Sequence, residues 1–275
     1  MTTATCPHMF QVAALRDGRP LPPRAVALTF DDGYADNLTL AAPLLRSMRL
    51  PATFFLVPGF LSGAVEAWWE VVAWAFSTGR AHEVEWQGEL FPLDTRRERI
   101  RANAVISASL KRMDRVARTA AVEEIVGRTE TVGRRPGREM FLDWAGARSL
   151  LQQGFAVGSH TSGHDILSQE TPERQVEDLT AARAALEREL SAEVPLLAYP
   201  NGTVADYDSG TLAAAAAAGH QFAMTTTEAF VTRACTPLEV PRCVIYPERG
   251  ALDIAAALRA AWRSALAVPQ GKLSG

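Results

Sequence analysis

The chain has 275 residues, of which 48% are hydrophobic and 21% charged, and its formal net charge is −3. This composition is typical of a globular protein, and its slightly acidic balance argues against a protein that binds nucleic acid or an anionic membrane surface. No stretch predicts a membrane-spanning helix and the amino terminus lacks the pattern of a secretory signal, so we expect a cytoplasmic protein whose cysteines (Cys6, Cys235 and Cys243) stay reduced.

The first predicted elements are strand, helix and strand. The apolar run Ala25–Phe30 predicts a buried strand, and the continuously apolar Ala52–Val57 predicts a parallel strand covered on both faces. Between them, the spacing over Leu38–Met48 predicts a helix. We expect its buried face to consist of Leu40, Leu44, Leu45 and Met48.

Residues 61–138 interrupt this alternation. The pattern predicts a tryptophan-rich helix over Glu66–Phe76, a hairpin from Val84–Trp86 and Leu90–Leu93, and helices over Arg96–Lys111 and Asp114–Val126. We interpret the segment as an insertion into a single domain that spans residues 1–275. Its tryptophans are expected in a core, because large aromatic side chains dominate buried area. The alternative is a stacking or lid surface over an active site.

After the insertion, strands and helices alternate again. The predicted strands are Phe155–Gly158, Pro195–Tyr199, Gln221–Thr226 and Leu238–Ile245, and the predicted helices are Asp143–Leu151, Thr171–Leu190, Tyr207–Ala218 and Gly250–Ala265. Such alternation predicts an α/β fold with a parallel sheet and helices outside it.

Two polar motifs follow predicted strands. Asp31 and Asp32 come at the end of the first strand, where two adjacent carboxylates repel each other and resist burial unless positive charge is nearby. His160 and His164 follow a later strand, four residues apart, and can converge on one metal ion. Either motif alone is weak, since an Asp-Asp-Gly sequence is commonly a turn. Together they favour a divalent metal site.

The position of these motifs in the predicted sheet supports the same site. Asp31, Asp32, His160 and the turn Pro200–Gly202 all come directly after strands. In a barrel of parallel strands, such residues share the rim at the carboxyl ends. We therefore expect separate stretches of sequence to converge on one pocket.

The motifs resemble those of the polysaccharide deacetylases, the NodB-homology or carbohydrate esterase 4 family. Thr29–Tyr34 resembles the first family motif, Ser159–His164 the second, and Tyr199–Gly202 a variant of the third. The resemblance implies a distorted (β/α) barrel with about seven parallel strands, a divalent metal, usually Zn²⁺, and hydrolysis of the N-acetyl group of an amino sugar.

The resemblance also implies roles for single residues. Asp32, His160 and His164 would bind the metal, and Asp31 would be the general base. Asn201 lies where a backbone N–H of the family helps to hold the oxyanion. We assign substrate contacts to three further motif residues, Tyr34, Tyr199 and Pro200.

The chain departs from the family pattern in two places. The third motif usually opens with an arginine that orients the base, but Ala198 stands there. We hypothesise that Arg242 supplies the guanidinium from a neighbouring strand end. The Leu-x-His motif that provides the general acid has no clear match, since His220 is more simply a residue of a helix-to-strand turn. The alternative is that Asp31 acts twice, first as the general base and then as the acid that protonates the leaving amine.

The leading hypothesis is a metal-dependent amidohydrolase that deacetylates an amino sugar or glycoconjugate. The alternatives are a deformylase or deacetylase of a non-sugar amide, a catalytically silent metal-containing saccharide-binding protein, and a scaffold that binds partners through the insertion. The sequence indicates neither the oligomeric state nor which of several divalent metals is bound, because these ligands suit more than one.

Overall fold

The computed structural model describes residues 14, 17, 19, 25–229, 231, 232, 235–245 and 250. Cys6 and the predicted helix Gly250–Ala265, apart from its first residue, lie outside the described residues. Cys235 and Cys243 are not joined by a disulfide. Among the described residues, no helix is both long and apolar enough to cross a lipid bilayer.

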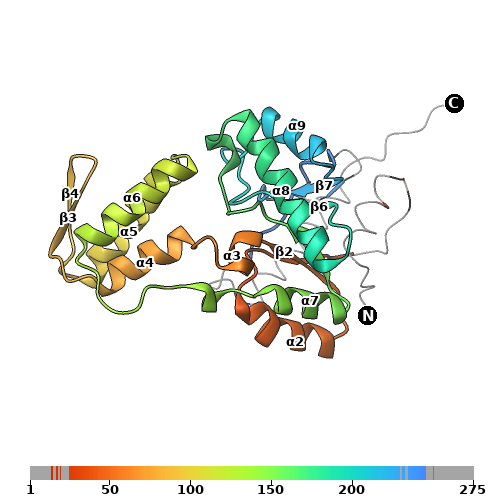
Figure 1. Ribbon diagram of the computed structural model, residues 1–275, viewed down its shortest axis with the longest axis horizontal. Coiled ribbons are helices and arrows are strands. Elements are labelled where there is room, and N and C mark those ends of the chain that lie inside the picture. The colour runs from red at the N-terminus through yellow and green to blue at the C-terminus, as the bar shows by residue number, and fades with distance from the viewer. Residues whose placement is uncertain are drawn as a thin grey trace.

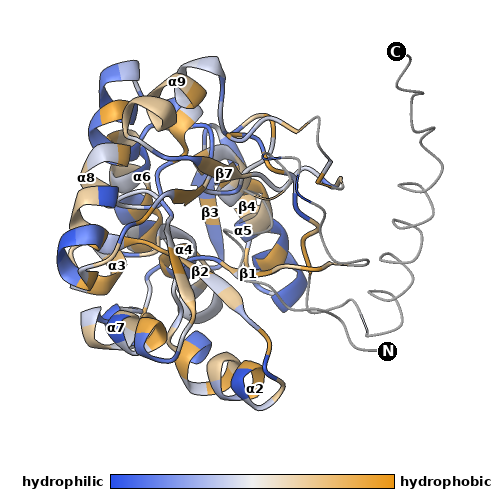
Figure 2. Ribbon diagram, turned by 90° about the vertical axis from the view of Figure 1, so that its right-hand side faces the viewer, coloured by the Kyte–Doolittle hydropathy of each residue, from blue (hydrophilic) through white to orange (hydrophobic). Residues whose placement is uncertain are grey.

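The core of the fold is a curled sheet of parallel strands in the order β1-β2-β5-β6-β7, which forms a half-barrel (Figure 2). The strands are β1 Leu28–Phe30, β2 Ala52–Leu56, β5 Ala156–Ser159, β6 Leu196–Ala198 and β7 Phe222–Met224. The predicted α/β fold with a parallel, barrel-like sheet is confirmed. The expected count of about seven strands is wrong for the described residues, which contribute five to this sheet.

The segment Leu238–Ile245 accounts for part of this difference. It was predicted as a strand, but only Val240 forms a bridge, to Met224 of β7. Pro241 follows at once and has no N–H to continue a ladder. The chain then turns, and the N–H of Arg242 donates to the carbonyl of Thr227.

The helices of the half-barrel follow the predicted alternation. They are η1 Asn37–Ala41, α2 Ala42–Ser47, α3 Pro58–Ser62, η2 Arg138–Met140, α7 Trp144–Gln152, η3 Leu167–Gln169, α8 Pro172–Leu190 and α9 Ser209–Ala217. Helix α8 begins as expected, with Thr171 as its N-cap and Pro172 as its first residue. The side chain of Thr171 accepts a hydrogen bond from the N–H of Arg174.

Strand β2 shows how the sheet is buried on both faces. Phe54 and Leu56 pack in a cluster with residues of α2, α7 and α8, whereas Phe55 packs on the inner face with residues of β6 and β7. All three side chains are fully buried. Because successive side chains of a strand point to opposite faces, a continuously apolar strand such as this one requires cover on both.

The helix predicted over Leu38–Met48 exists, but its buried face was predicted wrongly. Ala42 and Leu45 are buried, whereas the other three residues of the expected face are exposed. Residues Asn37–Ala41 form a π-helical turn, η1, rather than an α-helical one. A π turn shifts the helical register. The side chains that it carries outward are Leu40, Leu44 and Met48.

The predicted insertion forms a lobe beside the half-barrel, on the left in Figure 1. We call residues 68–128 the insertion lobe. Its elements are α4 Trp68–Thr78, β3 Glu83–Trp86, β4 Glu89–Pro92, α5 Arg96–Leu110 and α6 Arg115–Arg128. It has its own apolar core, in which Trp68 and Trp86 are buried, as predicted for the tryptophans. Trp69 and Trp74 are only partly buried against this core.

His220 leads to a prediction about stability and pH. It is buried between α9 and β7, and burial, reinforced by Arg183, lowers its pKa to about 4. The imidazole binds a proton more readily in the unfolded chain, so its neutral form contributes stability above pH ~6.5 that is lost as the pH falls towards ~4. When the pH falls from 7 to 4, the unfolding free energy of the wild type should therefore drop by roughly 2–3 kcal/mol more than that of the His220→Gln variant.

Urea unfolding at both pH values measures this difference. The control is His82→Gln, because the side chain of His82 is exposed on the insertion lobe beside Asp94. An equal loss of stability in wild type and His220→Gln would show that His220 does not titrate in this range.

Candidate functional site

The predicted site residues lie at the carboxyl-terminal edge of the sheet. Asp31 and Asp32 directly follow β1, and His160 directly follows β5. Asp32 and the next residue, Gly33, have left-handed backbones, with φ of +70° and +79°. A Cβ at Gly33 would lie 2.9 Å from the side chain of Leu56, so this tight turn requires glycine.

Asp32, His160 and His164 converge on one point. The Nε2 atoms of both histidines lie 3.3 Å from Oδ1 of Asp32. One ligand atom from each residue falls within 4.8 Å of the others. Two imidazole nitrogens and one carboxylate oxygen are a typical donor set for zinc with open coordination positions.

The hydrogen bonding of these residues also fits a metal. Oδ1 of Asp32 is buried, yet no hydrogen bond from the described residues reaches it. Nδ1 of His160 lies 2.7 Å from the carbonyl oxygen of Ala198, an acceptor that keeps the ring proton on Nδ1. The lone pair of Nε2 then faces Asp32. A divalent cation would satisfy both the orphaned carboxylate oxygen and this lone pair.

Charges at the site shift the pKa values of these groups. Burial favours the neutral acid of Asp32, but the two imidazoles outweigh it and hold the pKa well below its usual value. Burial also lowers the pKa of His164. For His160 the effect of burial is reversed by Asp32 and Asp31, and its pKa is raised.

Asp31 is paired with Arg242. Two nitrogens of the guanidinium donate to the two carboxylate oxygens of Asp31, each at 2.8 Å. Nε of Arg242 donates to the carbonyl of Thr225, at the end of β7, and the guanidinium lies over the ring of Phe55. Burial opposes ionisation of Asp31, but Arg242 and then His160 more than offset it and lower its pKa. The structure thus places the guanidinium where the sequence hypothesis expected it.

The insertion lobe contributes a wall beside His164. The indole of Trp69 lies with its ring centroid 4.4 Å from that of His164. Its Nε1 donates to the hydroxyl of Tyr34, which in turn donates to Glu70. Tyr34, one of the predicted substrate contacts, is half-buried at this wall. Trp69 is therefore the insertion tryptophan that fits the alternative expectation of a surface at the site.

The turn after β6 holds the other predicted residues. Asn201 has a left-handed backbone (φ +57°), and its Nδ2 is buried without a hydrogen-bond partner among the described residues. Pro200 is buried in the same turn. Tyr199 is only 1% exposed, stacks on Tyr207 and donates its hydroxyl to the carbonyl of Leu238. The prediction that Tyr199 contacts substrate is therefore wrong, since its side chain belongs to the core.

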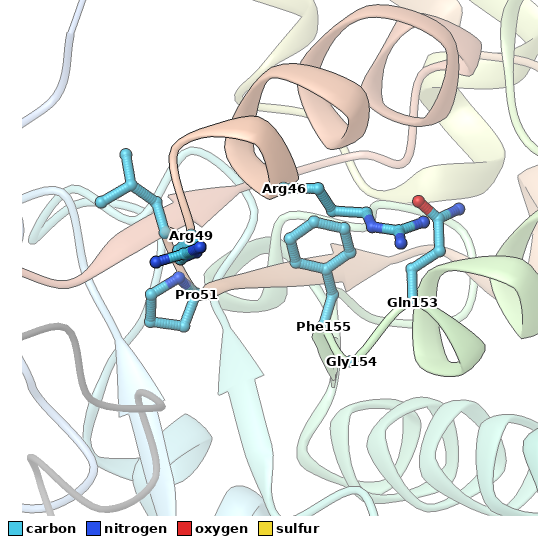
Figure 3. A pocket seen from close by; sticks show the side chains of 7 residues that line it. Arg46, Arg49, Pro51, Gln153, Gly154 and Phe155 are labelled. Atoms are coloured by element: carbon cyan, nitrogen blue, oxygen red, sulfur yellow. The ribbon is translucent and has the colours of Figure 1, made fainter.

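A hollow of about 360 Å³ lies elsewhere, at the turns that lead into β2 and β5 (Figure 3). Its lining includes Arg46, Arg49 and Phe155. These turns precede the strands, whereas every predicted site residue follows one. The hollow therefore lies at the opposite edge of the sheet from the site.

Sequence reasoning missed the groups that support the site from a distance. Asp165 follows His164 directly and forms a buried ion pair with Arg118 of α6, and Asp178 of α8 binds the backbone of Ser162. An acidic residue beside the second histidine was the one available signal for Asp165. Arg118 gave none, since arginines on a helix usually lie on its solvated face.

Comparison with known proteins supports the fold and the motifs. A family model described as polysaccharide deacetylase matches residues 18–223, a range that contains both carboxylates and both histidines. Poly-beta-1,6-N-acetyl-D-glucosamine N-deacetylase of Escherichia coli, in strains K12 and O157:H7, is 49% identical over 41 residues. That match spans 15% of this chain and only 6% of the relative.

Solved structures share the fold at low sequence identity. The deacetylase PplD of Streptococcus pyogenes, in complex with acetate, superposes with a TM-score of 0.61 and 17% identity, over 93% of this chain and 80% of that chain. IcaB of Ammonifex degensii gives a TM-score of 0.57 and 18% identity, over 94% and 82%. A de-N-acetylase of Aggregatibacter actinomycetemcomitans gives 0.57 and 16%, over 93% and 83%.

The pairing of Asp31 with Arg242 leads to a testable prediction. Replacing Arg242 by Met leaves a largely buried carboxylate without its cation. We expect a loss of about 1–3 kcal/mol of unfolding free energy at pH 7. Without the guanidinium, burial raises the pKa of Asp31 above its usual value. The loss should therefore begin to shrink as the pH falls through this raised pKa, and should go on shrinking until the pH reaches the lowered pKa of the wild type.

Urea unfolding with a chelator present measures this effect, and a double-mutant cycle provides its control. In an Asp31→Asn background, Arg242→Met should cost much less, since no charge is left unpaired. An equal cost in both backgrounds would contradict the pairing.

Proposed function

Because this chain belongs to the polysaccharide deacetylase family, we propose that it hydrolyses the N-acetyl group of an amino sugar in a saccharide or glycoconjugate. The observation that carries the proposal is the arrangement of the two neighbouring carboxylates. Asp32 faces two imidazole nitrogens, while Asp31 is held by a guanidinium beside them. A protein that only bound a metal would have no use for the second, ionised carboxylate.

We propose that Asp32, His160 and His164 hold a divalent cation, with zinc the ion that best suits this donor set. When bound, the ion would supply Lewis-acid chemistry, polarising the acetyl carbonyl and acidifying a water molecule. His160 is prepared for this role, since its Nδ1–H donates to the carbonyl of Ala198 and directs Nε2 towards the site.

Asp31 would act as general base. Arg242 keeps it ionised and fixes both carboxylate oxygens, so that it can accept a proton from the attacking water. The water oxygen forms a bond to the acetyl carbon, and the carbonyl oxygen gains negative charge. In this proposal the backbone N–H of Asn201 donates to that oxygen.

The second half of the reaction breaks the bond between the acetyl carbon and the amide nitrogen. The departing amine must gain a proton, and Asp31 holds the one taken from water. We propose that Asp31 returns this proton to the nitrogen. The products are then a free amino sugar, which carries the returned proton, and acetic acid, which keeps the second proton of the water and loses it to solvent to become acetate.

The first test is metal-dependent release of acetate from N-acetylglucosamine oligomers. We expect activity in the purified protein, its loss after treatment with a chelator such as dipicolinate, and its recovery on addition of zinc. His160→Gln should lose both activity and bound metal, whereas the exposed-histidine control His82→Gln should keep both. Full activity after complete metal removal would rule out the metal mechanism.

The second test concerns the base. Asp31→Asn removes the proton acceptor and should lower kcat by about 10²–10⁴-fold, with little change in KM. Arg242→Met should also lower kcat, because Asp31 loses both its charge partner and its fixed orientation. Steady-state acetate release on the same oligomers measures both effects. A kcat for Asp31→Asn within threefold of wild type would remove Asp31 from the mechanism.

A further inference from the structure

The loop that carries both histidines has a strained backbone. Thr161 and His164 are left-handed, with φ of +64° and +59°, a conformation that is unfavourable for a residue with a side chain. Such residues persist only where the surroundings hold them. On the half-barrel side, the carboxylate of Asp178 accepts the N–H of Ser162 at 3.0 and 3.2 Å.

On the other side, the loop is held by the insertion lobe. Arg118 of α6 donates to Oδ1 of Asp165 at 3.0 Å, and each residue is only 3% exposed. Arg118 also donates to the carbonyl of Met113, and its guanidinium lies 5.7 Å from the ring centroid of Trp68. A desolvated pair of this kind couples its two elements strongly, since losing one partner leaves a buried charge.

Asp165 transmits this contact to the histidine loop. It is the residue directly after His164, and its backbone N–H donates to Oγ1 of Thr161 at 3.1 Å. The backbone on both sides of His164 is therefore fixed, by Ser162 on Asp178 and by Asp165 on Arg118. The position of its ring follows from these anchors.

His164 depends on such anchors more than His160 does. Nδ1 of His160 lies 2.7 Å from a backbone carbonyl, whereas Nδ1 of His164 is buried without a partner among the described residues. A ligand histidine is usually oriented by a hydrogen bond at its second nitrogen. In its place, His164 has the packing of Trp69 and the position of its own backbone.

We propose that Arg118 is a positioning residue for the metal site, acting through Asp165 to fix His164, so that the insertion lobe sets metal affinity. This rests on the proposed role of His164 as a metal ligand. Among the described residues, Arg118 forms its hydrogen bonds and ion pair with Asp165 and Met113 and not with the ligand atoms, and the proposed effect is on where Nε2 of His164 points. The lobe has further contacts with the half-barrel through Arg115, whose N–H donates to Glu170 and whose guanidinium lies 3.5 Å from Oδ2 of Asp165. Loss of Arg118 therefore does not remove every contact between them.

The test is the zinc affinity of Arg118→Met, measured by competition with a chromogenic chelator. We expect a 10–100-fold weaker affinity, the usual cost of removing an outer partner of a ligand. The absorption bands of the cobalt-substituted protein should also change, because the ligand geometry changes. The matched control is Arg128→Met on the same helix, whose exposed pair with Glu124 should leave affinity within twofold of wild type.

A second variant covers the case in which Arg118→Met does not fold. Arg118→Met combined with Asp165→Asn removes both buried charges. The guanidinium of Arg115, 3.5 Å from Asp165, also loses this partner, but it is 36% exposed and so stays in contact with solvent. We expect the double variant to fold with about 10-fold weaker zinc binding. Arg118→Lys retains the positive charge and should recover part of the affinity. Wild-type zinc affinity and cobalt spectrum in a folded Arg118→Met, or in the double variant, would overturn the proposal.

The comparison of zinc affinities does not depend on which substrate the protein hydrolyses. If the wild type binds zinc but releases no acetate, the proposed function fails while the affinity comparison still decides the role of Arg118. If acetate is released and Arg118→Met binds zinc as well as wild type, only the role of Arg118 fails.

Discussion

Two adjacent carboxylates at the end of β1, a half-buried strand at the edge of the sheet, are the constraint on which the site depends. Asp31 and Asp32 cannot both be ionised there unless each meets positive charge. The backbone separates them, since the left-handed turn at Asp32 directs its side chain to the two histidines while Asp31 stays against Arg242. One carboxylate is thereby matched to a permanent cation and the other to nitrogen donors. The same strand end thus supplies two different chemical environments.

Much of the site could be predicted because parallel strands share one rim. The motifs at Asp31–Asp32 and at His160 each follow an apolar run, and the sheet brings them together. The prediction that Tyr199 contacts substrate was wrong for a related reason. Side chains alternate along β6, so Ala198 packs on the inner face and Tyr199 on the outer one, away from the site. A motif fixes which residues lie at the rim, and the alternation decides which of them face the site.

Other features had no local signal. The π turn at η1 rotates the face of the following helix, and Pro241 ends the pairing that the apolar residues beside it predicted. The pair Arg118–Asp165 joins residues far apart in the sequence, on a helix whose composition indicates a solvated surface. The insertion lobe thus has its own core and also contacts the site. It brings the indole of Trp69 and the buried guanidinium of Arg118 to the histidine loop.

The cation beside Asp31 comes from a part of the chain that similarity alone would discard. The family match ends at residue 223, within β7, whereas Arg242 lies beyond it. A fragment trimmed to the matched boundaries would keep every recognisable motif and lose the guanidinium. A search that demands arginine at the position of Ala198 would likewise score this chain as defective. Whether such a site is complete is better judged by whether a cation lies beside the carboxylate than by which strand that cation comes from.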